Sequence, residues 1–184
     1  MKITLVRSGS LVAVMLAALL AGCYSLKTLQ SAAEHGDAQA QNRLGNAYFD
    51  GRGVHQDYTE AARYFRMAAE QGLAEAQYNL GYAYVKGNGV PQNYAEALKW
   101  VRLAAEQGNT DAQYNLGYAC EKGLGVQPNA LEAYQWFNLA AAKGDARSIE
   151  HRDALTSRMS PEQVAAAQKL STEFVPKKSS AVGK

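Results

Sequence analysis

Two adjoining stretches of the chain carry the strongest structural pattern: Ala-Glu-Ala-Gln-Tyr-Asn-Leu-Gly-Tyr-Ala-Tyr at 74–84, and Lys-Gly-Asn-Gly-Val-Pro-Gln-Asn-Tyr-Ala-Glu-Ala-Leu-Lys-Trp at 86–100. In the first stretch, apolar residues recur at the spacing of one face of an α-helix. Gly87 and Gly89 then end that helix, because glycine adopts the left-handed conformation of a C-terminal cap without strain. The apolar face of this predicted helix consists of Ala76, Leu80, Ala83 and Tyr84.

A second helix is predicted directly after the loop. Asn93 has a glutamate, Glu96, three residues later, which is the spacing of a capping box at a helix N-terminus. Gly108 ends the helix, so one unit of the chain is a pair of helices. The same box spacing recurs as Asp57 with Glu60 and as Asn129 with Glu132. The apolar face of the second helix consists of Ala97, Trp100, Val101, Ala104 and Ala105.

The helix pair repeats with a period of 36 residues, in units that span 37–72, 73–108 and 109–144. Most of the 16 glycines of the chain belong to this repeat. Because a helix pair cannot bury its apolar face alone, successive pairs must stack on one another. The recurring glycines are Gly36, Gly72, Gly108 and Gly144; Gly45, Gly81 and Gly117; Gly51, Gly87 and Gly123; and Gly53, Gly89 and Gly125.

The flanking residues are predicted to cap this stack. Residues 23–36 are expected to form a lipidated N-terminus and a half-repeat helix, and residues 145–174 a degenerate capping repeat without the Gly-x-Gly loop. The last helix of that repeat follows Ser160, which forms a capping box with Gln163. Terminal repeats are atypical because they present a polar outer face to solvent. Residues 175–184 are predicted to be a disordered basic tail.

Residues 1–22 are predicted to be a signal peptide rather than part of the fold. A basic start precedes an apolar run from Leu11 to Ala21, which is too short to cross a bilayer but suits a secretory signal. The small residues before Cys23 resemble the lipobox of bacterial lipoproteins. That resemblance implies that Cys23 becomes the mature N-terminus and carries several acyl chains, palmitate among them, which anchor it stably. An ordinary cleaved signal with a chance cysteine and an uncleaved signal anchor are the alternatives.

The stretches 74–84 and 86–100, with Ala-Ala-Glu-Gln-Gly at 104–108, closely resemble the Sel-like repeat, a branch of the tetratricopeptide repeats with a longer helix–helix loop. The likeness covers residues 37–144. It implies an all-α fold, namely an α/α right-handed superhelical solenoid of stacked helix pairs. It also implies a scaffold that binds a protein or peptide partner on a concave face lined by the first helix of each pair.

Residues 36 apart occupy equivalent positions of successive units, and each such set is called a column. Three neighbouring columns match positions on that concave face. Tyrosines four residues apart, repeated on the next unit, form a ladder of rigid rings that offers contact area at low entropic cost. The asparagines beside them are suited to holding the backbone of an extended peptide. The alternative is that these columns serve only packing between units. The predicted partner-binding residues are Asn42, Arg43, Asn46, Tyr78, Asn79, Tyr82, Tyr114, Asn115 and Tyr118, of which the first three depart from the other units and are the better candidates for specificity.

The sequence contains no recognisable catalytic constellation. His35, His55 and His151 are scattered, and no zincin motif, nucleophile elbow or metal-type cysteine pair is present. We therefore expect no catalytic residue, no metal site and no cofactor. Cys120 falls in an inward apolar column, so we expect a buried hydrophobe, with a reactive thiol as the alternative.

The formal net charge of +2 arises from the two ends of the chain. The leader and the tail hold five basic side chains and no acidic ones, so residues 23–175 carry fourteen basic and seventeen acidic side chains, a net charge of −3. A mildly acidic folded part argues against a nucleic-acid partner, because phosphate binding requires an excess of cations.

Together these observations predict a non-enzymatic lipoprotein that binds a protein or peptide partner in the bacterial envelope. Tyr24 is not the aspartate that resembles an inner-membrane retention signal, which implies a lipid-anchored outer-membrane protein facing the periplasm if the source is Gram-negative. The alternatives are a peptidoglycan- or β-lactam-binding or hydrolysing envelope protein and an exported factor that contacts a host. The family branch with β-lactam-related activity has two cysteines per repeat, which this chain lacks.

Overall fold

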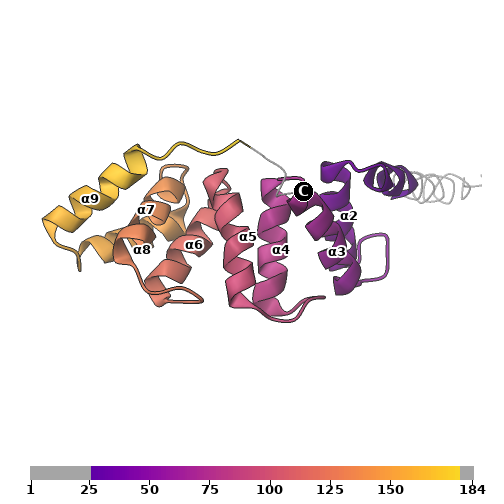
Figure 1. The fold of residues 1–184 in the computed structure, drawn as a ribbon, viewed down its shortest axis with the longest axis horizontal. Coiled ribbons are helices and arrows are strands. Elements are labelled where there is room, and N and C mark those ends of the chain that lie inside the picture. The colour runs from indigo at the N-terminus through magenta and orange to yellow at the C-terminus, as the bar shows by residue number, and fades with distance from the viewer. Residues whose placement is uncertain (1–25, 179–184) are drawn as a thin grey trace, which may run out of the picture.

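The computed structural model describes residues 26–178, and every regular element within them is helical. A helical segment at 26–34 precedes the helices α2 to α9. Figure 1 shows the helices side by side in an elongated stack, with α2 and α3 towards one end and α8 and α9 at the other. The prediction of an all-α helical solenoid is confirmed. The helices are α2 (Ala38–Asp50), α3 (Tyr58–Glu70), α4 (Ala74–Lys86), α5 (Tyr94–Glu106), α6 (Thr110–Lys122), α7 (Ala130–Ala141), α8 (Ala146–Thr156) and α9 (Pro161–Thr172).

In the second unit, a glycine ends the first helix and an asparagine begins the second. Gly87 caps α4 with a φ of 73°, in the left-handed region that glycine tolerates, and its N–H donates to the carbonyl of Ala83. Asn93 caps α5 by accepting the backbone N–H of Glu96. Gly51 and Gly123 act like Gly87 in the neighbouring units, and Asp57 and Asn129 act like Asn93.

The predicted capping boxes form only in part. The Glu96 carboxylate pairs with Lys99 rather than with the backbone of Asn93. The equivalent glutamates also pair with cations, Glu60 with Arg63 and Glu132 with Arg102. Within residues 26–178, both bonds of a capping box are present at Ser160 and Gln163, at the start of α9. A cation within reach therefore competes with the backbone for each repeat glutamate.

A buried glutamine joins each unit to the helix before it. Gln77 in α4 is 1% exposed, and its Nε2 donates to the carbonyl oxygen of Ala69 in α3 at 3.2 Å. Its Oε1 accepts from Nε2 of Gln107, the residue after α5, at 2.8 Å. Gln107 also donates to the carbonyl oxygen of Gly72 at 3.0 Å. We call this set of bonds the glutamine link. In the first unit, Gln41 makes the equivalent bonds with Ala33 and Gln71.

The third glutamine link is incomplete. Gln113 in α6 donates to the carbonyl oxygen of Ala105 at 3.1 Å. Lys143 stands where the second unit has Gln107, and its ammonium group donates to the carbonyl oxygen of Gly108. The Oε1 atom of Gln113 is buried and has no hydrogen-bond partner among the described residues. The third unit therefore keeps a buried polar atom unsatisfied, which is costly.

The helices α8 and α9 close the stack, and the chain then turns back along it. Phe174 packs edge-on against Trp136 of α7, with ring centroids 5.5 Å apart. The backbone N–H of Lys177 donates to the carbonyl oxygen of Glu106 at 2.9 Å, and its ammonium group pairs with the Glu106 carboxylate at 2.7 Å. Residues 175–178 begin the tail that was predicted to be disordered, and in the structure they lie against the second helices of two units.

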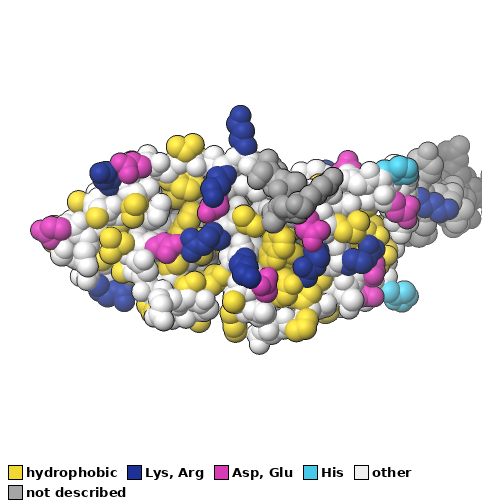
Figure 2. All heavy atoms as spheres, viewed as in Figure 1, with side chains coloured by type: hydrophobic (Ala, Val, Ile, Leu, Met, Phe, Trp, Pro, Cys, Tyr) yellow, Lys and Arg dark blue, Asp and Glu magenta, His cyan; other side chains and the backbone are white. Residues whose placement is uncertain are grey.

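The surface and the termini add three observations. Figure 2 shows cationic and anionic side chains interspersed over one face of the molecule, with hydrophobic side chains between them. Among the described helices, none has both the length and the apolar character that crossing a membrane requires. The predicted signal peptide, Cys23 and residues 179–184 lie outside the described residues.

Replacing Lys143 with glutamine is expected to complete the third glutamine link. The new side chain can donate to both Gly108 and Gln113, as Gln107 does to Gly72 and Gln77. We expect the free energy of unfolding to rise by about 1 kcal/mol, because a buried acceptor gains a donor. Urea unfolding followed by circular dichroism measures the change.

The matched control is Gln107→Lys, which introduces the same defect into the second unit. It is expected to lower the free energy of unfolding by about 1–3 kcal/mol. Unchanged stability in both variants would show that the glutamine link does not hold the units together.

Candidate functional site

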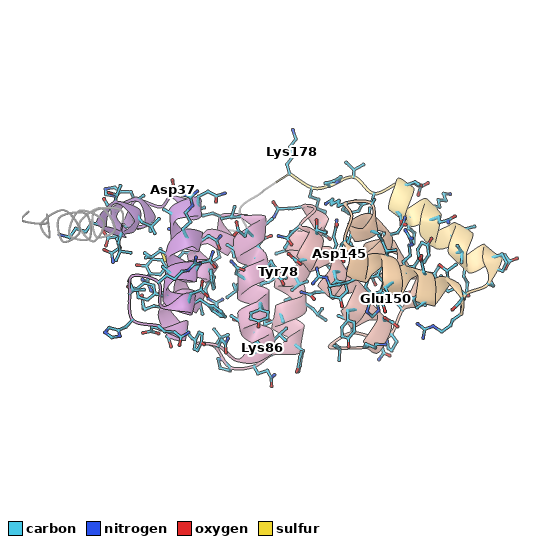
Figure 3. All side chains as sticks on the ribbon, turned by 180° about the vertical axis from the view of Figure 1, so that it is seen from behind. Asp37, Tyr78, Lys86, Asp145, Glu150 and Lys178 are labelled. Atoms are coloured by element: carbon cyan, nitrogen blue, oxygen red, sulfur yellow. The ribbon has the colours of Figure 1, made fainter. Side chains whose placement is uncertain are left out.

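A hollow of about 330 Å³ opens between the second and third units, on the side of the first helices. A second hollow of about 310 Å³ adjoins it, shares Tyr78 and Tyr82 with it, and reaches Asn46 and Phe49 of α2. Figure 3 shows Tyr78 near the middle of this side of the molecule and Lys86 close to its lower edge. We call the first hollow the tyrosine groove. Its main lining side chains are Tyr78, Tyr82, Tyr94, Leu98, Tyr118 and Leu124.

The groove gathers exposed apolar side chains. Tyr82, Tyr94, Tyr118 and Leu124 are 38%, 46%, 37% and 42% exposed. They are four of the eight large hydrophobic residues that are exposed in the described part of the chain. Single exposed hydrophobic residues are normal on a protein surface, but a contiguous group marks a site of interaction.

The repeat itself positions the rings. Tyr82 on α4 and Tyr118 on α6 occupy the same column, so the stacking of units brings both to the same groove. A lysine follows each tyrosine by one helical turn. The Lys86 Nζ atom lies 5.7 Å from the ring centroid of Tyr82, and the Lys122 Nζ atom lies 5.8 Å from that of Tyr118. At this distance a cation is attracted to the face of an aromatic ring.

The structure brings six of the nine predicted partner-binding residues to the two hollows. They are Asn46, Tyr78, Asn79, Tyr82, Asn115 and Tyr118. Tyr114 lies beside Tyr118, with ring centroids 6.4 Å apart, and is covered by α8 as described below. Arg43 lines a separate hollow formed with the helical segment 26–34. Asn42 is 1% exposed and so presents no surface to a partner.

The side-chain amides of Asn79 and Asn115 form hydrogen bonds to the preceding unit and are not free to bind a partner. The Nδ2 atom of Asn79 donates to Oδ1 of Asn42 at 3.0 Å and to Oδ1 of Asn46 at 3.4 Å. The Nδ2 atom of Asn115 donates to the hydroxyl of Tyr78 at 3.3 Å. These amides therefore fix one unit against the next, which differs from the expectation that they hold a peptide backbone.

Tyr78 is the most enclosed ring of the groove. Burial raises the pKa of its hydroxyl, the Asp111 carboxylate raises it further, and the hydrogen bond from Asn115 opposes the change. The hydroxyl therefore remains protonated at neutral pH. It is available as a neutral donor at the base of the groove.

The degenerate capping repeat closes one end of the first-helix side. His151 of α8 stacks on Phe137, with ring centroids 5.0 Å apart, and meets the edges of Tyr114 and Tyr118, each at 5.7 Å. Arg147 lies over the Tyr114 ring at 4.3 Å. The sequence pattern predicts no role for His151 or Arg147, and the structure brings both side chains to this end of the stack. The 36-residue period could have identified His151 as a first-helix residue, because it occupies the same repeat position as Asn79 and Asn115.

A buried carboxylate holds α8 in this position. The Glu121 side chain is 8% exposed, and its oxygens lie 2.9 Å from His151 Nδ1, 2.9 Å from Arg158 and 3.1 Å from Lys122. Burial by itself raises the pKa of Glu121, but hydrogen bonds from Arg158, His151 and Lys122 outweigh it and hold the pKa below its usual value. Glu121 is therefore ionised and binds three cationic or polar groups at once.

Cys120 is enclosed in the core. It is fully buried, and burial together with the nearby Glu132 carboxylate raises the pKa of its thiol to about 12. The thiolate is the nucleophilic form, so the folded protein keeps this cysteine unreactive. Within residues 26–178, no group of histidine, cysteine, aspartate and glutamate is arranged to hold a metal ion.

Cys120 is expected to resist a thiol reagent in the native protein. In a Cys23→Ser background, Cys120 is the only cysteine of the chain. Titration with Ellman's reagent at pH 8 should give a reaction at least about a hundredfold slower than in 6 M urea, because modification requires unfolding. Prompt reaction of the native protein would restore the alternative of a reactive thiol.

Comparisons with known proteins agree with this architecture. A family model for the Sel1 repeat matches residues 38–73, 74–109 and 110–145, more than half of the chain. A protective antigen present in uropathogenic Escherichia coli strains, which displays an SLR fold, is similar with a TM-score of 0.76 and 35% identity. That match covers 84% of this chain and 33% of the antigen, so this chain spans about a third of its length.

A Sel1 repeat protein from Oxalobacter formigenes is also similar, with a TM-score of 0.66 and 39% identity over 71% of this chain and 98% of that protein. No curated protein matches the chain. Sel1 repeat proteins generally mediate protein–protein interactions. The three matched repeats and the shared solenoid establish that this chain belongs to the Sel1 repeat family.

Proposed function

We propose that this chain is a non-enzymatic binding protein of the bacterial envelope, and that its tyrosine groove holds a segment of a protein or peptide partner. One observation carries the proposal: the exposed rings of Tyr82, Tyr94 and Tyr118 gather in a single hollow on the first-helix side. Tyrosine supplies a large contact area with few rotatable bonds, and its hydroxyl adds a polar anchor.

The surroundings of the groove support binding rather than packing within the chain. The Tyr78 and Asn115 side chains are already bonded to each other, which keeps the groove wall rigid before a partner arrives. A preformed wall lowers the entropic cost of association. A partner that buries three or four of these half-exposed rings gains most of its binding free energy from them, as is usual for aromatic residues at the centre of protein interfaces.

A scaffold role agrees with the chemistry of the described residues. The thiol of Cys120 is buried and protonated, and His151 is engaged by Glu121 and three aromatic rings. Neither group faces the tyrosine groove as a nucleophile or a base. The envelope location rests on the leader and on Cys23, whose lipobox-like context supports anchoring to the outer membrane.

Replacing Tyr82 and Tyr118 with alanine is expected to abolish partner binding while the fold persists. Each truncation removes about 2 kcal/mol of binding free energy, so the double variant should bind at least about a hundredfold more weakly. The partner is identified by placing a photocrosslinking amino acid at position 82 or 118 in envelope preparations, and affinity is then measured with that purified partner.

Leu170→Ala serves as the matched control, because Leu170 is 42% exposed but lies on α9, away from the groove. Its affinity should equal that of the unaltered chain, and a crosslinker at 170 should not give the same adduct. If the groove positions yield no protein adduct while the purified chain binds muropeptides, the partner-binding proposal is wrong. Loss of helicity in the double variant would instead make the rings part of the core.

Cys23→Ser is expected to release the protein from the membrane. Without the thiol, the lipid that the lipobox-like context implies cannot be attached at position 23, and membrane anchoring through it is lost. Fractionation of cells into outer membrane, inner membrane and soluble periplasm measures the change. Unchanged membrane fractionation of the variant would contradict the lipid anchor.

A further inference from the structure

Lys86 is the charged side chain that lines the tyrosine groove, and the described part of the chain gives it no carboxylate partner. It ends α4, its Nζ atom lies over the Tyr82 ring, and the structure records no ion pair for it among residues 26–178. The other groove-lining side chains are aromatic, aliphatic or amide groups. The groove is therefore apolar with one positive charge at its edge.

The equivalent lysine of the next unit shows what Lys86 lacks. Lys122 ends α6 and lies over Tyr118 in the same way, but its ammonium group pairs with the adjacent Glu121 at 3.1 Å. The residue before Lys86 is Val85, which lines the groove instead of supplying a carboxylate. The same repeat position thus holds a lysine paired with a carboxylate in the third unit, and in the second unit an exposed lysine with no carboxylate partner among residues 26–178.

The helix dipole accounts for only part of this arrangement. A cation in the last turn of a helix is favourable, and that applies equally to Lys86 and Lys122. It does not account for the difference between the two lysines in the residue that precedes them, which is Val85 in the second unit and Glu121 in the third. An apolar wall beside an unpaired ammonium group is complementary to a ligand with an apolar side chain next to a carboxylate.

We propose that the tyrosine groove binds a short peptide segment in which an aromatic or aliphatic side chain lies among the tyrosine rings and a neighbouring carboxylate pairs with Lys86. The carboxylate belongs to an aspartate or a glutamate of that segment. This inference rests on the proposed function, since it names the chemistry of the partner that the groove accepts.

The test begins with a random dodecapeptide library displayed on phage and selected on the full-length chain immobilised in detergent. Enriched sequences are expected to share an acidic residue within two positions of an aromatic or aliphatic one. A synthetic peptide of the enriched sequence is then compared with its Asn or Gln analogue by fluorescence anisotropy. The amide analogue should bind about tenfold more weakly.

Variants of the chain assign this preference to Lys86. Lys86→Gln should weaken the acidic peptide about tenfold but leave the amide analogue unchanged, so that the two effects are not additive. Val85→Glu should have the same effect, because it recreates the internal pair of the third unit, whereas Val85→Gln should keep the preference for the acidic peptide. Lys122→Gln is the matched control and should alter affinity less than about twofold.

The outcomes separate this inference from the proposed function. Enriched peptides that lack acidic residues, or that bind Lys86→Gln as tightly as the unaltered chain while Tyr82→Ala/Tyr118→Ala abolishes binding, would overturn the carboxylate pairing and leave the groove as a binding site. Peptides insensitive to both tyrosines would overturn both proposals. A self-associating chain that becomes monomeric in the tyrosine variant would show that a second copy occupies the groove.

Discussion

A glutamine buried at the start of each first helix is the constraint on which the stack depends. Gln41, Gln77 and Gln113 each donate to a carbonyl of the preceding helix, and the first two also accept from a glutamine at the end of the following helix. A buried amide that loses its partners costs about 1–3 kcal/mol, so the side chain tolerates only the register that satisfies it. The hydrophobic faces alone would permit units to slide, because apolar contact is not directional.

That fixed register is what produces the groove. Tyr82 and Tyr118 are far apart in the sequence but occupy one column, and a constant relation between units brings both rings to the same hollow. The hydrogen bonds that Asn79 makes to α2 and Asn115 makes to α4 add to the same rigidity. At the far end, Glu121 holds α8 through His151 and Arg158, so that the degenerate repeat ends the column of first helices.

The sequence predicted the helix pairs, their glycine ends and the tyrosine positions, because these depend on local conformational preference and on a period visible in one dimension. It did not distinguish Asn42, which is buried, from Asn46, which lines a hollow, since both satisfy the same column pattern. It predicted complete capping boxes at Glu60, Glu96 and Glu132, where nearby cations take the carboxylates instead. It also missed His151 and Arg147, whose roles arise only when α8 packs beside α6.

The sequence by itself determined the repeat, the all-α class and the membership of the Sel1 family, because glycine caps and apolar periodicity act within about one helical turn. Only the tertiary structure decided which side chains of a column are open to a partner and which close the contact between units. The physical reason is that exposure and ion pairing depend on the neighbouring unit. Tyr78 and Tyr114 occupy equivalent positions of two units, but Tyr78 lines the groove, whereas Arg147 and His151 of α8 cover Tyr114.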